Sequence, residues 1–134
     1  MTRPMPEIVG AKVRSISSME ELQDVCMNGV NNNTKASSNI SIIDFYATWC
    51  PPCRMAAPVF AKMSMESEYS NIQFLKVNVD QAKDVARHYK VSAMPTFILL
   101  QGTTAIETQV GWSERNVRNM LNNNNKASGR GIIT

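Results

Sequence analysis

The sequence contains no apolar run as long as the 18 or more residues that a transmembrane helix needs, and we expect no membrane partner. The opening residues, Met-Thr-Arg-Pro-Met-Pro-Glu, include no apolar core of the kind that a secretory signal requires. Three cysteines in 134 residues are too few, and odd in number, for a secreted disulfide scaffold. We therefore expect a cytoplasmic protein that keeps its thiols reduced by default.

A concentrated basic surface is also missing, although the formal net charge is +3. Residues 15–114 hold ten acids and seven bases, so the basic excess lies at the two ends of the chain. A domain that binds nucleic acid usually concentrates its positive charge on one face or helix. We therefore expect no nucleic-acid partner.

The length fits one domain, which we assign to residues 1–125, with 126–134 as a flexible C-terminal tail. The run of four asparagines from Asn122 to Asn125 is typical of a loop or a helix end, because asparagine side chains compete with helix backbone hydrogen bonds. We also expect a monomer.

Hydrophobic periodicity predicts strands that alternate with helices. The expected strands are Ile8–Ser15, Ile40–Ala47, Ile72–Val79, Pro95–Leu100 and Ile106–Val110, the last of them half-exposed. The expected helices begin at Ser17 or Ser18 and at Pro51, span Asp80–Lys90, and begin again at Ser113. In the second helix the apolar stripe runs through Met55, Val59 and Met63, and most of the nine methionines are expected in the core. This order predicts an α/β fold, with a central mixed sheet of four to five strands flanked by about four helices.

Two cysteines stand three residues apart, where a buried strand meets the start of a helix. Cys50 and Cys53 enclose Pro51 and Pro52, and proline is tolerated in the first helical turn. Unpaired N–H groups and the positive end of the helix dipole favour the thiolate at Cys50, which is the form that attacks disulfides. Cys53 is then placed to attack a mixed disulfide and release the product.

The alternative interpretation of this pair is half of a zinc site, which needs two further ligands. Cys26 and His88 are the remaining Cys and His residues, and each falls on a separate expected helix without zinc-type spacing. We therefore expect no metal. Cys26 lies on the apolar stripe of the first helix, so we interpret it as a small core residue, with a regulatory thiol as the alternative.

One carboxylate interrupts the apolar run Ile42-Ile43-Asp44-Phe45-Tyr46. Burial of a lone carboxyl is costly, and it raises the pKa of Asp44 toward the range that suits proton exchange with a thiol. The alternative is a surface acid on an edge strand, which the apolar neighbours on both sides disfavour.

The segment Asp44-Phe45-Tyr46-Ala47-Thr48-Trp49-Cys50-Pro51-Pro52-Cys53-Arg54 resembles the active site of the thioredoxin family. Further along the chain, Ala93-Met94-Pro95-Thr96-Phe97 is similar to the cis-proline loop of that family. The late glycines, Gly102 and Gly111, match as well. The resemblance covers about Val13 to Leu121, and the Trp-Cys-Pro-Pro-Cys version is most similar to the h-type cytosolic thioredoxins of plants.

The resemblance implies a thioredoxin fold and a role for each matching residue. Cys50 would be the nucleophile and Cys53 the resolving thiol, while Asp44, supported by Lys76, would exchange the proton of Cys53. Substrate would bind at the residues that surround this pair, which are Trp49, Pro52, Met94, Pro95, Gly111 and Trp112. Core packing is the alternative role for Trp49 and for Trp112.

Three positions depart from the family pattern, and Cys26, described above, is one of them. Pro51 stands where glycine is more common and removes a backbone donor near the Cys50 sulfur, which we expect to shift the reduction potential. Trp112 follows Gly111 at a position that more often carries a small residue.

The function that the resemblance implies is a protein-disulfide reductase that maintains cellular redox homeostasis. It would have no cofactor of its own, since the sequence carries no dinucleotide fingerprint, and would receive electrons from NADPH through a separate thioredoxin reductase. The implied clients are peroxiredoxins, methionine sulfoxide reductases and ribonucleotide reductase. The alternatives are a relay or isomerase of the same fold with another electron donor, and a non-catalytic binding module.

Overall fold

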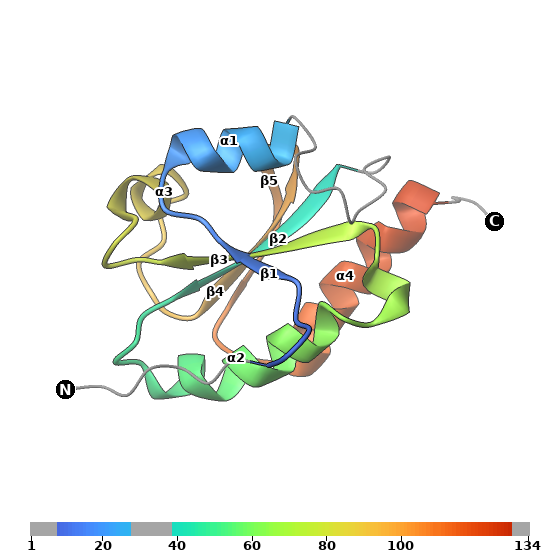
Figure 1. The fold of residues 1–134 in the computed structure, drawn as a ribbon, viewed down its shortest axis with the longest axis horizontal. Helices are drawn as coiled ribbons and strands as arrows, with labels where there is room; N and C mark the ends of the chain where they lie inside the picture. Colours follow the sequence, from blue (N-terminus) through green and yellow to red (C-terminus); the bar gives the residue numbers. More distant parts are fainter. Residues whose placement is uncertain (1–7, 28–38, 130–134) are drawn as a thin grey trace.

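A five-stranded mixed sheet forms the centre of the computed structural model, which describes residues 8–27 and 39–129 (Figure 1). The strand order is β1-β3-β2-β4-β5, in which β1, β3 and β2 run parallel while β4 and β5 run antiparallel to their neighbours. The strands are β1 Val13–Ser15, β2 Ile40–Tyr46, β3 Ile72–Asn78, β4 Thr96–Gln101 and β5 Thr104–Val110. The predicted α/β mixed sheet is confirmed.

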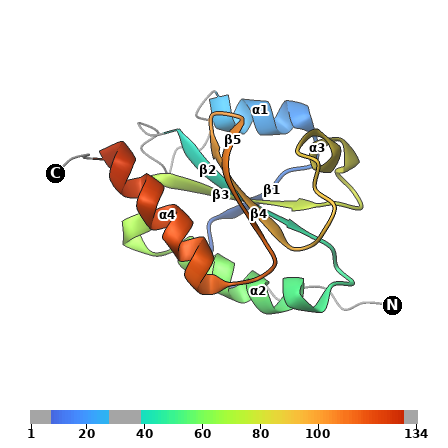
Figure 2. The same ribbon diagram turned by 180° about the vertical axis from the view of Figure 1, so that it is seen from behind.

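Helices cover both faces of this sheet, as Figures 1 and 2 show from opposite sides. The helices are α1 Met19–Met27, α2 Pro51–Met63, α3 Lys83–His88 and α4 Glu114–Gly129, with a 3-10 turn over Ser67–Tyr69. Side chains alternate along β2, so Ile42 packs with α2 and α4 whereas Ile43 packs with α1 and α3. Burial on both faces explains the nearly continuous apolar sequence of this strand. Within the described ranges, no helix is long and apolar enough to cross a membrane.

Helix α2 begins at Pro51 because Cys50, with extended backbone, forms its N-cap and prolines suit the first turn. Its buried positions are Cys53, Ala56, Phe60 and Met63. The predicted stripe through Met55 is wrong, since this side chain is 67% exposed. Met55 lies about 200° around the helix from Cys53, and therefore on its outer side.

The expectation that most methionines lie in the core is not met among those of the described residues, and Met1 and Met5 lie outside them. Met63 and Met120 are buried, but Met27 and Met65 are exposed along with Met55. Met27 ends α1 beside the turn at Gly102, where its sulfur lies 3.2 Å from the position that a Cβ at Gly102 would take. Helical spacing alone does not distinguish a core methionine from one at the border of a helix.

Helix α4 continues through the asparagine run instead of ending there. The Asn122 side chain accepts a hydrogen bond from the Tyr69 hydroxyl (2.9 Å), and Asn124 donates to Glu107 on β5 (3.0 Å). Both amides have tertiary partners, and Asn124 also donates to the Met120 carbonyl of the same helix at 2.8 Å. The helix extends to Gly129, and residues 130–134 of the expected tail lie outside the described residues. The division into a domain over 1–125 and a tail over 126–134 stays a prediction.

Two smaller expectations need correction. The third helix is shorter than Asp80–Lys90, because the Asn78 side chain accepts the backbone N–H of Asp80 (2.9 Å) and forms a turn before the helix. Strand β5 is more exposed than half-exposed, with Ile106 38% and Val110 60% accessible. It is one of the two edge strands of the sheet, and α1 and α3 cover the strands nearer the centre.

Candidate active site

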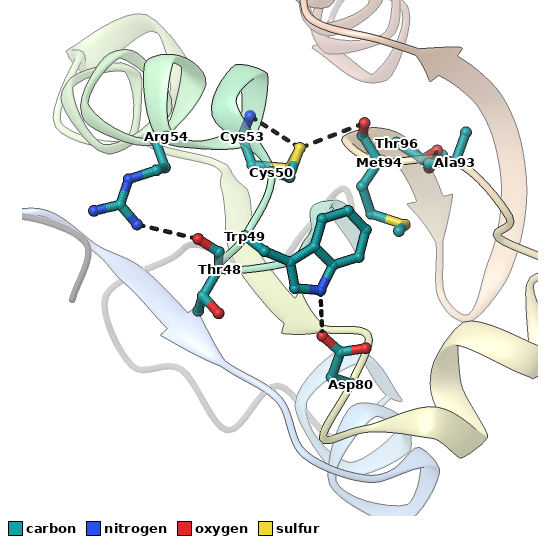
Figure 3. The surroundings of a disulfide bond; sticks show 9 residues. All are labelled: Thr48, Trp49, Cys50, Cys53, Arg54, Asp80, Ala93, Met94 and Thr96. Atoms are coloured by element: carbon teal, nitrogen blue, oxygen red, sulfur yellow. Dashed lines mark hydrogen bonds between the residues drawn. A yellow bond between two sulfur atoms is a disulfide. The ribbon is translucent and has the colours of Figure 1, made fainter. Parts of the chain in front are cut away.

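Cys50 and Cys53 form a disulfide at the N-terminus of α2, with their Cα atoms 5.3 Å apart (Figure 3). The backbone N–H of Cys53 donates to the Cys50 sulfur at 3.3 Å. Cys50 is 4% exposed and Cys53 is fully buried, so Cys50 lies nearer the surface. In the dithiol form, this N–H and the positive end of the helix dipole stabilise negative charge on the Cys50 sulfur.

The two prolines limit which backbone N–H groups can donate a hydrogen bond to the Cys50 sulfur. Pro51 and Pro52 occupy the first two helical positions and have no N–H to donate. The first N–H of the helix therefore belongs to Cys53, and it is directed at the sulfur of Cys50. Both prolines are exposed at the surface around the disulfide.

The loop before β4 lies against the disulfide. The Met94–Pro95 peptide bond is cis, as the resemblance implied, and the Met94 carbonyl oxygen lies 3.6 Å from the Cys50 sulfur (Figure 3). Gly111 donates its N–H to the Pro95 carbonyl at 2.8 Å. Gly111 has a φ of 87°, a left-handed conformation that glycine adopts without strain. Residues from the start of β4 and the end of β5 are thus assembled beside the cysteines.

Trp49 extends from the loop before Cys50 toward Asp80 (Figure 3). Its indole N–H donates to the Asp80 carboxylate at 2.9 Å, and the side chain is 58% exposed. Core packing of Trp49 is therefore wrong. Asp80 was not predicted from the sequence, although its place just after β3, at the same sheet edge as the end of β2, was a usable signal.

Asp44 is 4% exposed and lies on the face of β2 that α2 covers, so the edge-strand alternative is wrong. Its Oδ1 atom has no hydrogen-bond partner among the described residues. Burial raises the pKa of Asp44 to about 7, and the charge of Lys76, its register partner on β3, opposes this rise. A carboxyl with such a pKa can both accept and release a proton near neutral pH.

Trp112 is half-buried and packs against the core between the sheet, α2 and α4. Its ring centroid lies 5.6 Å from that of Phe97, with the planes tilted by 48°. This contact supports a packing role for Trp112.

Cys26 is 1% exposed, which confirms its interpretation as a core residue. Its sulfur lies 3.6 Å from the Ser41 hydroxyl oxygen, and burial raises the pKa of the thiol. A high pKa and burial both reduce thiol reactivity. In residues 8–27 and 39–129, no group of three or more His, Cys, Asp or Glu side chains could hold a metal ion.

Comparison with known proteins gives a consistent family signal. The family model named Thioredoxin matches residues 23–123. Thioredoxin H5 of Arabidopsis thaliana is 41% identical over 85 residues, which cover 63% of this chain and 70% of the relative. A crystal structure of a thioredoxin from Nicotiana alata has a TM-score of 0.73 at 30% identity and covers 89% of this chain and 97% of its own.

Two further matches extend the comparison. One solved structure comes from work on the thiol resolving mechanism of a yeast mitochondrial 1-Cys peroxiredoxin via glutathione and thioredoxin systems. It has a TM-score of 0.68 at 27% identity, and the match covers 85% of this chain and 99% of that one. A peptide-N(4)-(N-acetyl-beta-glucosaminyl)asparagine amidase of Caenorhabditis briggsae is 40% identical over 103 residues, or 76% of this chain. The match spans only 16% of that relative's length.

Proposed function

Because the chain belongs to the thioredoxin family, we propose that it is a protein-disulfide reductase that cycles between the Cys50–Cys53 disulfide and the corresponding dithiol. The observation that carries the proposal is the setting of the Cys50 sulfur. It lies at a helix N-terminus, accepts the Cys53 N–H, and faces the backbone of the cis-proline loop.

The first half of the reaction is an attack by the Cys50 thiolate on one sulfur of a client disulfide. A bond forms between the Cys50 sulfur and that client sulfur while the client disulfide breaks. The second client sulfur leaves as a thiolate and takes up a proton. Stabilisation of the Cys50 thiolate by the Cys53 N–H favours this step at neutral pH.

The second half resolves the mixed disulfide. Asp44 accepts the proton of Cys53, and the resulting thiolate attacks the Cys50 sulfur. The Cys50–Cys53 disulfide forms, the client is released as a dithiol, and two electrons have passed from the protein to the client. Asp44 suits this role because its pKa of about 7 matches the pH at which the proton must be transferred.

Client binding would use the surface that surrounds Cys50. We assign the backbone groups of Met94 to an extended client segment, because strand addition gives affinity with little sequence preference. Trp49, Pro52, Pro95 and Gly111 would supply the contacts on either side. The contribution of Trp112 is separable from theirs, because its ring packs toward Phe97.

Replacement of Trp112 by alanine should lower the free energy of unfolding by about 2 kcal/mol, because a half-buried indole and its contact with Phe97 are lost. Trp112→Phe, which retains a ring at this position, should recover most of the loss. Denaturant unfolding of the three proteins measures the effect. A Trp112→Ala protein of unchanged stability that reduces a protein substrate more slowly would assign the residue to docking instead.

Electrons would come from NADPH through a separate thioredoxin reductase, with no cofactor bound to this chain. Peroxiredoxins are proposed clients, in keeping with the peroxiredoxin study noted above, and methionine sulfoxide reductases and ribonucleotide reductase are further ones. We propose that the protein acts as a monomer in the cytoplasm and supports electron transport and redox homeostasis there.

The test is reduction of insulin by the purified chain with NADPH and thioredoxin reductases of different origin. We expect turnover that depends on the chain, the reductase and NADPH together. Turnover with dithiothreitol but with none of the reductases would indicate a relay fed by another donor, and faster disulfide reshuffling than net reduction would indicate an isomerase. Full cellular function of a Cys50→Ser protein would indicate a non-catalytic binding module.

A further inference from the structure

A row of polar side chains crosses the sheet beneath the N-terminal end of α2. Ser15, Lys76 and Asp44 are register partners on β1, β3 and β2, and Tyr46 and Asn78 form the next pair toward the carboxyl ends of the strands. Residues two apart on a strand share a face, so all five lie on the side that α2 covers. A buried carboxyl and a lysine are therefore direct neighbours in this row.

These two groups do not form an ion pair. None of the ion pairs in the described residues joins Lys76 to Asp44, and the Asp44 Oδ1 atom has no hydrogen-bond partner there. The Lys76 ammonium lies instead over the ring of Tyr46, 6.0 Å from its centroid. The negative face of an aromatic ring attracts a cation at this range.

The ring of Tyr46 is itself fixed in place. It packs against the cluster of Ala47, Cys50 and Cys53, and Asn78 is its register partner on β3. A cavity of about 70 Å³ lies beside it, with Lys76, Ser15 and Asn78 among its lining residues. Such a polar cavity has room for water, so the ammonium can remain hydrated at this edge.

We propose that Tyr46 is a positioning residue that holds the Lys76 ammonium at the carboxyl edge of the sheet and so prevents it from closing an ion pair with Asp44. The inference deepens the proposed function, because Asp44 must gain and lose a proton in each cycle. A closed ion pair would favour the carboxylate permanently and make it a weak base.

The groups that face Asp44 are few, which makes the assignment testable. Lys76 comes from β3 and Tyr46 from β2 itself, while β1 contributes Ser15 and β4 presents Phe97 opposite Asp44. The helix that covers this face, α2, carries Cys53 as a buried titratable group. Lys76 is the cation in this set, and its charge opposes the upward shift that burial gives the pKa of Asp44.

The experiment is a carbon-13 NMR titration of the Asp44 carboxyl in the oxidised protein and its variants. Tyr46→Leu keeps an apolar side chain but removes the ring, so the ammonium should move to Asp44 and lower its pKa by about one unit. Tyr46→Phe keeps the ring and should retain the wild-type value. Tyr46→Met serves as a second ring-free variant if Tyr46→Leu folds poorly.

A double mutant isolates the lysine. In a Lys76→Met background, Tyr46→Leu should leave the pKa of Asp44 unchanged, because the cation that the ring positions is gone. A ring-free variant with the wild-type pKa, or with a higher one, would overturn the proposal. So would an equal decrease in the Lys76→Met background, which would mean that the ring acts by excluding water.

This titration needs no turnover, so its outcome is distinct from that of the proposed function. If the chain reduces no insulin but the pKa of Asp44 shifts as expected, the role of Tyr46 is supported and the proposed reductase function is contradicted. As a readout of the reaction itself, the pH at which the reduction rate is half-maximal should decrease in Tyr46→Leu and not in Tyr46→Phe.

Discussion

A Cys50→Ser protein should reduce insulin no faster than the chemical reductant alone, whereas Cys26→Ser should keep the wild-type rate. The serine hydroxyl is not ionised at neutral pH and cannot form the mixed disulfide, so every later step is lost. Cys26 is the matched control, because it is a cysteine that does not belong to the Cys50–Cys53 pair. Its side chain is 1% exposed and lies in the core. The rates are measured as the increase in turbidity when insulin is reduced in the presence of dithiothreitol.

Two results would contradict this expectation. If Cys50→Ser retained a substantial share of the rate, Cys53 or another group would be the nucleophile. If Cys26→Ser lost the rate while unfolding at the same denaturant concentration as the wild type, the buried thiol would have a part in the reaction. Circular dichroism of both proteins controls for the fold.

Asp44→Asn should make the oxidised protein more stable at alkaline pH and leave it little changed near pH 4. The folded state raises the pKa of Asp44 from 3.8 to about 7, so it holds a proton that the unfolded chain releases. Stability from this group is present in full below about pH 4 and is lost as the pH rises through about 7. Between these two pH values the protein loses ~4 kcal/mol of stability through this carboxyl. The Asp44→Asn protein avoids this loss, because the asparagine amide does not ionise.

Denaturant unfolding between about pH 4 and about pH 8.5 measures this difference. A stability gap that grows with pH supports the raised pKa, whereas a gap that is constant with pH would contradict it. The same variant should slow resolution of the mixed disulfide by about 100-fold, which is typical when a positioned general base is removed. We expect an inflection near pH 7 in the rate of the wild type, and the variant should lack it.

Sequence reasoning identified the fold and the centre of the site because their signals are local. The alternation of strands and helices follows from hydrophobic periodicity, and β2 was recognised from its apolar run. Cys50 and Cys53 were recognisable from their spacing at a helix start. Asp44 stood out because a carboxylate in a buried strand is costly.

The features that were missed depend on contacts between distant segments. The hydrogen bond from Trp49 to Asp80 joins two loops that follow different strands, and the sequence does not say which acid the indole meets. The cation–π contact between Lys76 and Tyr46 depends on the register of β2 against β3. Met55 was misplaced because its exposure depends on which side of α2 faces the sheet.

The central claim is that Cys50 attacks and Cys53 resolves, and trapping with a Cys53→Ser variant tests it most directly. The reduced variant is mixed with an oxidised protein substrate such as insulin, and the products are mapped by mass spectrometry after proteolysis. We predict a stable mixed disulfide between Cys50 and the substrate, absent from the wild type and from a Cys50→Ser, Cys53→Ser double variant. A substrate attached through Cys26, or no covalent complex at all, would contradict the account.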